Sequence, residues 1–480
     1  MKPQMNPDKH GWQRPPDDDV MSPVTAAKEG RWSADCAPAH GVRIPSGCAG
    51  RNEQTSPAFE LRTPLPLPSL PTATRPERAR RAGPGGAIIP APKKNPLQKI
   101  GITAVVLFAI TFAAAGCRQV PKNSSSPDFY PLGIYGVKSN DFGAVRAAGF
   151  NLVFGAPSLD VLETATRQGL RVVASPPALG KGDAASAANA VMARTADRHP
   201  GLWAWYLADE PELNQVSPVV LRERRAALRA AGANKPTAVV FYHASDAHHY
   251  AAESDIVMVD RYPVPWEPLA VAGAQWRLGR LTAGPAKPFI AVLQAFDWSA
   301  HKDLLPGEGN LRPPNREELR CMVYQALAQG ADGLFFYAFE SGSWKLREHP
   351  ATWQALQEVI GEVNDRRGLF KGERLWVPRA FNLGSGPERR NATLDASIAP
   401  VLLRVTIPSR TVPVGDYLLC VNTTPMPQFM GFGIPAKKLE GLPVLGEGRY
   451  LPVESDWAAD DFAPYAVHIY GPFHATEAAR

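Results

Sequence analysis

The chain has 480 residues, which exceeds one ordinary domain and predicts two or three. Its formal charge of +6 belongs to the first part of the chain: of 52 Lys and Arg and 46 Asp and Glu, residues 1–117 hold 15 and 9, which leaves 37 of each for residues 118–480. A body without net charge has no electrostatic attraction for a phosphate backbone, so we exclude nucleic acid as a partner of the folded part.

Residues 1–92 are rich in Pro, Ala, Arg and short polar residues and have almost no periodic apolar pattern. Such a segment cannot bury enough apolar surface to fold, so we predict that it is a disordered leader or precedes the true start site. Lys93, Lys94 and Lys99 then lead into an apolar run, 100–116, that ends in small residues. This order is that of an export signal, with a membrane-spanning helix at its short limit as the alternative.

The sequence Ala114-Ala115-Gly116-Cys117 closes the apolar run and resembles the lipobox of bacterial lipoproteins. The resemblance implies a signal peptide over 93–117, acylation of Cys117, and a body anchored to a membrane by lipid outside the cytoplasm, in the periplasm or at the cell surface. Residues 118–128 are then a polar linker. The body retains two distant cysteines, Cys321 and Cys420, which form no disulfide framework, so we expect buried free thiols. No Cys or His spacing indicates a metal, and no cofactor is expected.

From residue 129 onward, short apolar runs alternate with amphipathic stretches. The predicted strands are 130–137, 151–156, 170–176, 202–208, 237–243, 255–263, 288–296 and 331–340. The predicted helices are 141–149, 158–169, 185–198, 217–231, 244–253, 269–281, 315–330 and 351–367. Eight strand-then-helix units without a glycine-rich phosphate loop predict a (β/α)8 barrel over 129–370.

Residues 373–475 change in character. Alternating stretches at 402–407, 417–421 and 465–470 are separated by Pro, Gly and Asn, and no helical pattern is present. This predicts a small antiparallel β-sandwich domain after the barrel.

The fourth strand runs into two adjacent acids, Asp209 and Glu210, and is stopped by Pro211. Acids at the end of a buried strand are costly to desolvate, which makes them candidates for function. The alternative is that Asp209 caps the next helix and Glu210 is solvated.

In a (β/α)8 barrel the active site lies at the C-terminal ends of the strands. Carboxylates, amides and aromatic rings converge there, a combination that suits a neutral polyhydroxylated ligand. These strand-end residues are Tyr206, Asp209, Glu210, His243, Asp260, Tyr262, Gln294, Asp297, Trp298, Tyr337 and Glu340. Glycoside cleavage needs an acid and a second carboxylate, and Glu210, beside another carboxylate and apolar rings, is the best candidate for the acid.

The run Trp205-Tyr-Leu-Ala-Asp-Glu-Pro211 resembles the fourth-strand signature of the large clan of retaining glycoside hydrolases with (β/α)8 barrels. That clan carries Asn-Glu-Pro there, and its Glu is the acid/base. The resemblance implies that Glu210 is the acid/base and that Asp209 takes the place of the Asn that binds the 2-hydroxyl of the sugar.

The sequence departs from this clan at the seventh strand, where Gln294 stands in place of the nucleophilic Glu. Glutamine can neither form a glycosyl ester nor act as a base. The second carboxylate is then Glu340, which we favour, or Asp260 or Asp297; the alternative for Glu340 is an ion pair with a basic residue at the barrel mouth.

The C-terminal segment 462–470, together with 444–449 and 422–424, resembles the β domains that pack beside the barrel in many glycosidases. Three functions remain open: a hydrolase of oligo- or polysaccharides, a non-catalytic carbohydrate-binding lipoprotein that has lost its nucleophile, and a tethered scaffold for another envelope protein. Gln294 is the residue that favours the second.

Overall fold

The computed structural model describes residues 129–179, 184–304, 309–376, 380–382, 390–391, 398–436 and 438–475. The predicted leader, signal peptide, lipidation site at Cys117 and linker lie outside the described residues. Within the described ranges, no helix is long and apolar enough to cross a membrane.

Eight parallel strands close into a barrel in sequence order, from β1 to β8, which confirms the predicted (β/α)8 fold. The barrel strands are β1 (Leu132–Ile134), β2 (Leu152–Gly155), β3 (Arg171–Ala174), β4 (Leu202–Asp209), β5 (Thr237–Phe241), β6 (Ile256–Arg261), β7 (Phe289–Gln294) and β8 (Gly333–Tyr337). Their residues are almost all buried, because side chains fill the barrel on one face and helices cover the other.

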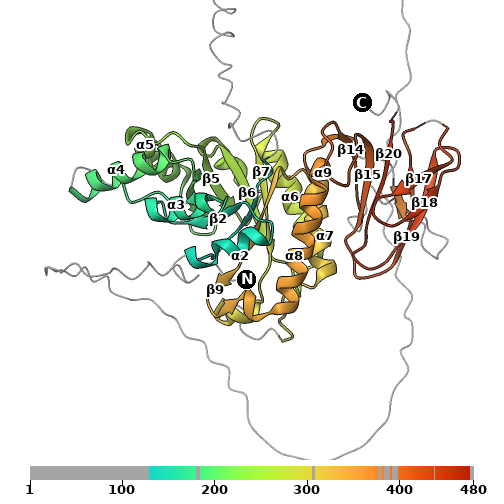
Figure 1. The fold of residues 1–480 in the computed structure, drawn as a ribbon, viewed down its shortest axis with the longest axis horizontal. Helices are drawn as coiled ribbons and strands as arrows, with labels where there is room; N and C mark the ends of the chain where they lie inside the picture. Colours follow the sequence, from blue (N-terminus) through green and yellow to red (C-terminus); the bar gives the residue numbers. More distant parts are fainter. Residues whose placement is uncertain are drawn as a thin grey trace, which may run out of the picture. The chain divides into compact units, whose positions relative to one another are not determined.

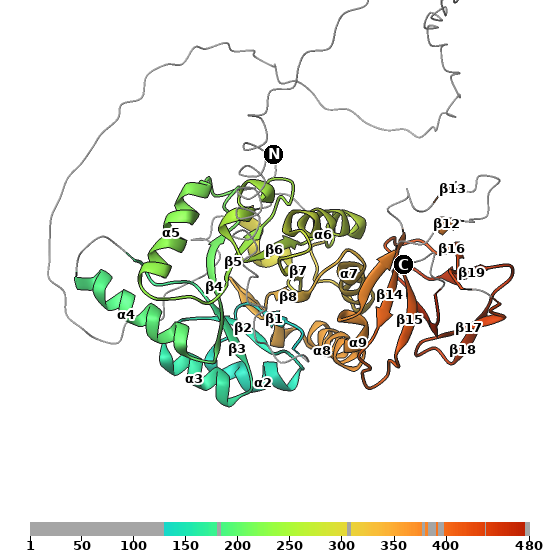
Figure 2. The same ribbon diagram turned by 90° about the horizontal axis from the view of Figure 1, so that it is seen from above.

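Helices surround the strands, as Figure 2 shows. The α-helices are α2 (Phe142–Ala147), α3 (Leu159–Arg167), α4 (Ala184–Arg198), α5 (Pro218–Ala230), α6 (Leu269–Ala283), α7 (Arg316–Ala328), α8 (Pro350–Asp365) and α9 (Arg367–Phe370). Short 3-10 turns are η3 (Ser139–Asp141), η4 (Ala247–His249), η5 (Ala251–Glu253), η6 (Trp298–Leu304) and η7 (Leu346–Glu348). The helix predicted over 244–253 is therefore a pair of 3-10 turns. Helix α7 begins with a capping box, in which the Asn315 side chain accepts from the backbone N–H of Glu318 at 2.8 Å.

The eighth strand is shorter than predicted and ends at Tyr337. Its two neighbours, β1 and β7, end at Ile134 and Gln294, so the following residues have no strand to pair with. The chain instead crosses the end of β1, where the N–H of Phe339 donates to the carbonyl of Tyr135 at 2.9 Å. It then forms a two-stranded hairpin of β9 (Glu340–Ser341) and β10 (Trp344–Lys345).

The C-terminal region is a β-sandwich, as predicted, made of a six-stranded sheet in the order β11-β14-β15-β20-β17-β18 and a four-stranded sheet in the order β13-β12-β16-β19. The strands are β11 (Glu373–Trp376), β12 (Ala380–Asn382), β13 (Arg390–Asn391), β14 (Ile398–Val405), β15 (Gly415–Asn422), β16 (Gln428–Gly433), β17 (Gly441–Val444), β18 (Arg449–Pro452), β19 (Trp457–Phe462) and β20 (Val467–Phe473). One core fills the space between the sheets, with Leu418 and Cys420 from one sheet packed against Met430 and Phe432 from the other.

Helix α7 is buried on more than one side because it packs against β7 and also against β14, β15 and β20 (Figure 1). Two side chains of this helix donate hydrogen bonds to the β-sandwich. The Cys321 thiol donates to the carbonyl of Asn422 at 3.4 Å, and the Arg320 guanidinium donates to the carbonyl of Val467 at 3.2 Å. Cys321 and Cys420 are both free and buried, as the sequence predicts.

Candidate active site

The turn after β4 places Glu210 at the mouth of the barrel. The backbone of Glu210 has a positive φ of 40°, an uncommon conformation for a residue with a side chain. Three hydrogen bonds hold it there: the N–H of Glu210 donates to the carbonyl of Val240 at 3.0 Å, and the Asn214 side chain donates to the carbonyls of Asp209 and Glu210 at 3.0 and 3.2 Å. Backbone strain kept by such contacts is characteristic of functional sites.

Glu210 lies beside Asp260 on β6, close enough for hydrogen bonding between their carboxyl groups to contribute to the pKa of each. Both residues are only 2% exposed. When two carboxyls are hydrogen-bonded, one of them carries a proton, so the pair then has at most one negative charge. The structure thus joins two of the predicted catalytic residues into one acid pair.

Burial is the main cause of the raised pKa values of this pair. It raises the pKa of Asp260 to about 7, and the negative charges of Asp209 and Glu212 act in the same direction. The hydrogen bonds from Glu210 and Tyr262 oppose this increase by stabilising the Asp260 carboxylate. Burial likewise raises the pKa of Glu210 well above its ordinary value, with the charge of Asp260 next in importance. Both shifts therefore favour the protonated form of each acid as the pH approaches neutrality.

Asp209 faces a pair of tyrosines and is separate from this hydrogen bond. The Tyr206 hydroxyl donates to Oδ1 of Asp209, and the ring of Tyr206 lies edge-on to that of Tyr135, at 6.3 Å between centroids. Burial raises the pKa of Asp209, and the bond from Tyr206 offsets part of that increase. Asp209 is thus a hydrogen-bond acceptor that Tyr206 fixes in place beside the acid pair.

Aromatic rings form a wall around the carboxyls. The ring centroids of Tyr262 and Tyr337 lie 5.5 Å apart, and that of Tyr135 lies 5.8 Å from Tyr337. Trp298 continues the wall 6.2 Å from Tyr262 and donates its indole N–H to the Tyr262 carbonyl at 3.2 Å. Such rings supply apolar faces beside polar groups, as expected of a site for a polyhydroxylated ligand.

Gln294, predicted to bind substrate, makes its hydrogen bonds to backbone groups of the protein. Its amide nitrogen donates to the carbonyls of Val264 and Phe296 at 2.9 and 3.0 Å, and its oxygen accepts from the N–H of Val264 at 2.8 Å. The residue has no exposed surface. Gln294 therefore ties the loop after β6 to the end of β7.

Changing Gln294 to Glu is expected to destabilise the protein rather than to supply a nucleophile. The change removes two donors and leaves the buried carbonyls of Val264 and Phe296 facing an acid, which costs about 3–5 kcal/mol. Thermal unfolding at pH 5 and pH 8 measures this, with Gln294→Met as a control that adds no charge. A gain of hydrolytic activity without loss of stability would contradict this structural role.

The other predicted residues also have defined places. Oδ1 of Asp297 accepts from the N–H of Ser299 at 2.8 Å and so begins η6. Glu340 lies beyond the barrel strand, on β9, and pairs with Lys138 at 2.7 Å, with 26% of its side chain exposed. This is the ion pair that the sequence left open as the alternative for Glu340. The acid pair thus includes neither Asp297 nor Glu340.

Glu212 was not predicted, although it belongs to the same acidic run as Glu210. Its Oε1 accepts from the backbone N–H groups of Tyr242 and His243 at 2.6 and 2.8 Å, which ties the turn after β4 to the end of β5. Burial raises the pKa of Glu212 to about 7. Glu212 and His243 thus shape the rim of the site, the latter through its backbone.

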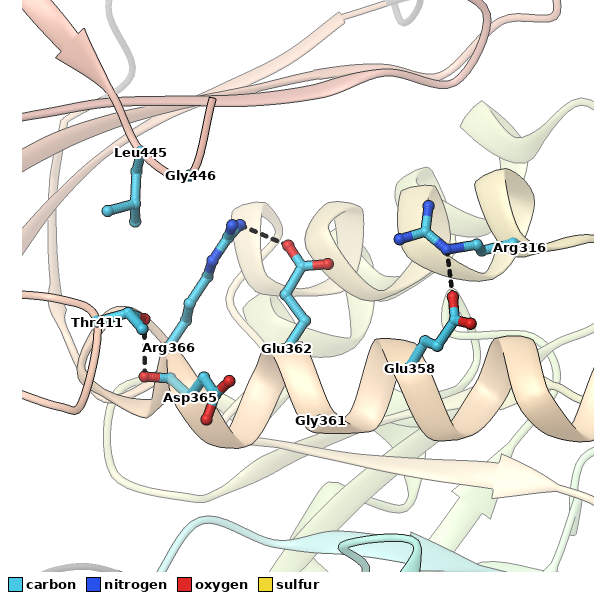
Figure 3. A pocket seen from close by; sticks show the side chains of 9 residues that line it. All are labelled: Arg316, Glu358, Gly361, Glu362, Asp365, Arg366, Thr411, Leu445 and Gly446. Carbon is cyan, nitrogen blue, oxygen red and sulfur yellow. Dashed lines mark hydrogen bonds and ion pairs between the residues drawn. The ribbon is translucent and has the colours of Figure 1, made fainter. Parts of the chain in front are cut away.

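Neither of two surface hollows has Glu210 or Asp260 in its lining. One, of about 500 Å³, is lined by Glu212, Pro218, Asp246, His249 and Tyr250. The other, of about 650 Å³, lies between α8 and loops of the β-sandwich (Figure 3). Its charges are all paired, Arg316 with Glu358 at 2.7 Å, Arg366 with Glu362 at 2.5 Å and Asp365 with Arg410 at 2.6 Å, so we place the site at the barrel mouth instead. Among the described residues, no group of three or more His, Cys, Asp or Glu side chains could hold a metal ion.

No protein-family model and no curated protein sequence matches the chain. Solved structures similar to it include glycoside hydrolases. AmyP in complex with maltose is 12% identical with a TM-score of 0.43, over 71% of this chain and 90% of that chain. A GH42 beta-galactosidase from G. stearothermophilus, in a catalytic mutant form, is 10% identical with a TM-score of 0.45, over 72% and 98%. A glycoside hydrolase family 5 protein from Bacteroides vulgatus ATCC 8482 is 14% identical with a TM-score of 0.45, over 73% and 93%. At these values the similarity carries no argument about activity.

Proposed function

We propose that the protein hydrolyses glycosidic bonds of an oligo- or polysaccharide with Glu210 as general acid/base and Asp260 as the second carboxylate. The observation that carries the proposal is the buried pair of Glu210 and Asp260 at the barrel mouth, in which burial raises the pKa of both acids. An acid that keeps its proton at neutral pH beside a carboxylate is what glycoside cleavage requires. The tyrosines and Trp298 around the pair support a sugar as the ligand.

In the proposed reaction, substrate displaces the hydrogen bond between the two acids. The carboxylate of Asp260 attacks the anomeric carbon, and the bond to the leaving oxygen breaks as Glu210 gives that oxygen its proton. Glu210, now a carboxylate, then takes a proton from water, whose oxygen attacks the anomeric carbon and releases Asp260. Oδ1 of Asp260 is buried without a hydrogen-bond partner among the described residues, which leaves an oxygen for this role.

The contact between the acids predicts retention of the anomeric configuration. Carboxyls close enough to shift each other's pKa through hydrogen bonding are nearer to the separation of about 5–5.5 Å in retaining enzymes than to the roughly 6.5–9.5 Å that holds a water in inverting ones. Proton NMR of the sugar during the first minutes of hydrolysis distinguishes the two outcomes. Release of the inverted anomer first would contradict the role of Asp260 as nucleophile.

A second function, carbohydrate binding without cleavage, is favoured by Gln294, which occupies the position where the resembled clan has its nucleophile and is fully used in backbone contacts. Purified protein incubated with a panel of aryl glycosides, oligosaccharides and polysaccharides separates the two, with sugar release and binding scored in parallel. Release supports the hydrolase. Binding without release identifies a sugar receptor.

We also propose that the protein acts in the cell envelope. The export-signal pattern over 93–117 and the lipobox-like sequence that ends in Cys117 support a lipid-anchored protein of the cell envelope. Metabolic labelling with a fatty-acid analogue tests this, because Cys117→Ser abolishes the label if Cys117 is the acylated residue.

A further inference from the structure

Three side chains form a hydrogen-bonded chain that leads away from the acid pair. The Tyr337 hydroxyl, at the end of β8, lies 2.6 Å from Oγ of Ser341 on β9, and that oxygen lies 3.3 Å from Nε2 of His301 in η6. Ser341 and His301 are 6% and 5% exposed. The chain therefore connects the loop after β7, through the loop after β8, to a tyrosine of the site.

The two loops are packed closely enough to fix this chain. Gly342 has a φ of 57°, and a Cβ there would lie 3.2 Å from the carbonyl of Ala300 and 3.4 Å from the His301 ring. The His301 ring also lies edge-on to Phe296, at 5.4 Å between centroids. Close packing on two sides holds the imidazole toward Ser341.

The direction of the hydrogen bonds follows from the charges nearby. A serine hydroxyl has one proton, so Ser341 donates either to Tyr337 or to His301. Tyr337 lies in the negative field of Asp209, Glu210 and Asp260. This field favours the orientation in which the Tyr337 O–H points toward the carboxyls and its lone pairs point away from them. Ser341 then donates to Tyr337, and Nε2–H of His301 donates to Ser341.

We propose that His301 and Ser341 are positioning residues that make Tyr337 a hydrogen-bond donor to an oxygen of the bound sugar. The inference rests on the proposed function for its ligand, because it assigns Tyr337 to the substrate of the same site. Its first test nevertheless needs no substrate, so the two can fail separately.

That test is the tautomer of His301, read by long-range ¹H–¹⁵N NMR on the purified protein with ¹⁵N-labelled histidine. The signal of His301 is assigned by its absence from His301→Gln. We expect a neutral ring with its proton on Nε2 in the wild type. A ring with its proton on Nδ1 only would reverse the chain and overturn the inference, whether or not the protein cleaves any sugar.

The second test is kinetic and uses the aryl glycoside that the wild type cleaves fastest. Tyr337→Phe and Ser341→Ala are each expected to raise KM by roughly 3- to 10-fold with little change in kcat, since each removes a binding donor or its support. Ser341→Thr keeps the hydroxyl and retains the wild-type KM. Wild-type kinetics in Ser341→Ala, or an equal defect in Ser341→Thr, would overturn the positioning role, whereas no cleavage by the wild type would count against the proposed function instead.

Discussion

Glu210→Gln and Asp260→Asn are each expected to lower kcat/KM by a factor of about 10² or more on substrates with a poor leaving group. Glutamine keeps the size of Glu210 and cannot give up a proton, while asparagine at 260 cannot attack the anomeric carbon. Both variants retain a hydrogen-bonding side chain opposite the remaining acid. The loss therefore reports the chemistry of the pair rather than its packing.

The leaving group separates the two roles. A 2,4-dinitrophenyl glycoside has a leaving group that departs without protonation, so Glu210→Gln is expected to lose much less activity on it, whereas Asp260→Asn loses activity on both substrates. Glu340→Gln is the matched control, because Glu340 is a partly exposed acid paired with Lys138 on the same rim. Full loss in Glu340→Gln with activity kept in Asp260→Asn would identify Glu340 as the second carboxylate.

Glu210→Gln is expected to stabilise the folded protein, and increasingly so as the pH rises. The pKa values of Glu210 and Asp260 are raised in the folded state, the latter to about 7, so between about pH 4 and pH 7 the folded protein binds more protons than the unfolded chain. The free energy of unfolding of the wild type therefore falls as pH rises through this window. Removing one acid relieves this cost, and the relief is largest at high pH, where the wild type must hold both buried carboxylates without a proton.

Thermal unfolding across this window measures the effect. We expect similar Tm values for wild type and Glu210→Gln at pH 4 and a higher Tm for the variant at pH 8. Glu340→Gln, which changes a more exposed and ion-paired glutamate, should follow the wild type at every pH. A Tm difference that stays constant from pH 4 to pH 8 would mean that the stability gain does not come from the proton of the pair.

The barrel could be predicted from sequence because a local sequence pattern indicates each of its strands and helices. Strand β4 is a run of buried apolar residues stopped by Pro211, and α7 begins with the Asn315 and Glu318 capping pair. The β-sandwich has the same kind of local signal in its alternating strands. These patterns need no knowledge of distant contacts.

The partners of each acid could not be predicted in the same way. The pairing of β4 with β5 shifts register between Tyr206 and Ala208, so simple alternation does not say which of Asp209 and Glu210 faces Asp260. The end of the eighth strand depends on where β1 and β7 end, which is why Glu340 was placed on a barrel strand and lies on β9. The Gln294 side chain is hydrogen-bonded to Val264 in the loop after β6, and no local sequence pattern indicates this contact.

Glu210 and Asp260 are proposed to hold one proton between them at neutral pH. The most direct measurement is a ¹³C NMR titration of protein labelled at the glutamate side-chain carboxyls, with Glu210 assigned by its absence from Glu210→Gln and Glu212 assigned in the same way from Glu212→Gln. We predict that the Glu210 signal titrates well above pH 4.5 and moves to lower pH in Asp260→Asn, which removes the neighbouring charge. A Glu210 signal that titrates near pH 4.5 and is unchanged in Asp260→Asn would contradict the acid pair and, with it, the proposed mechanism.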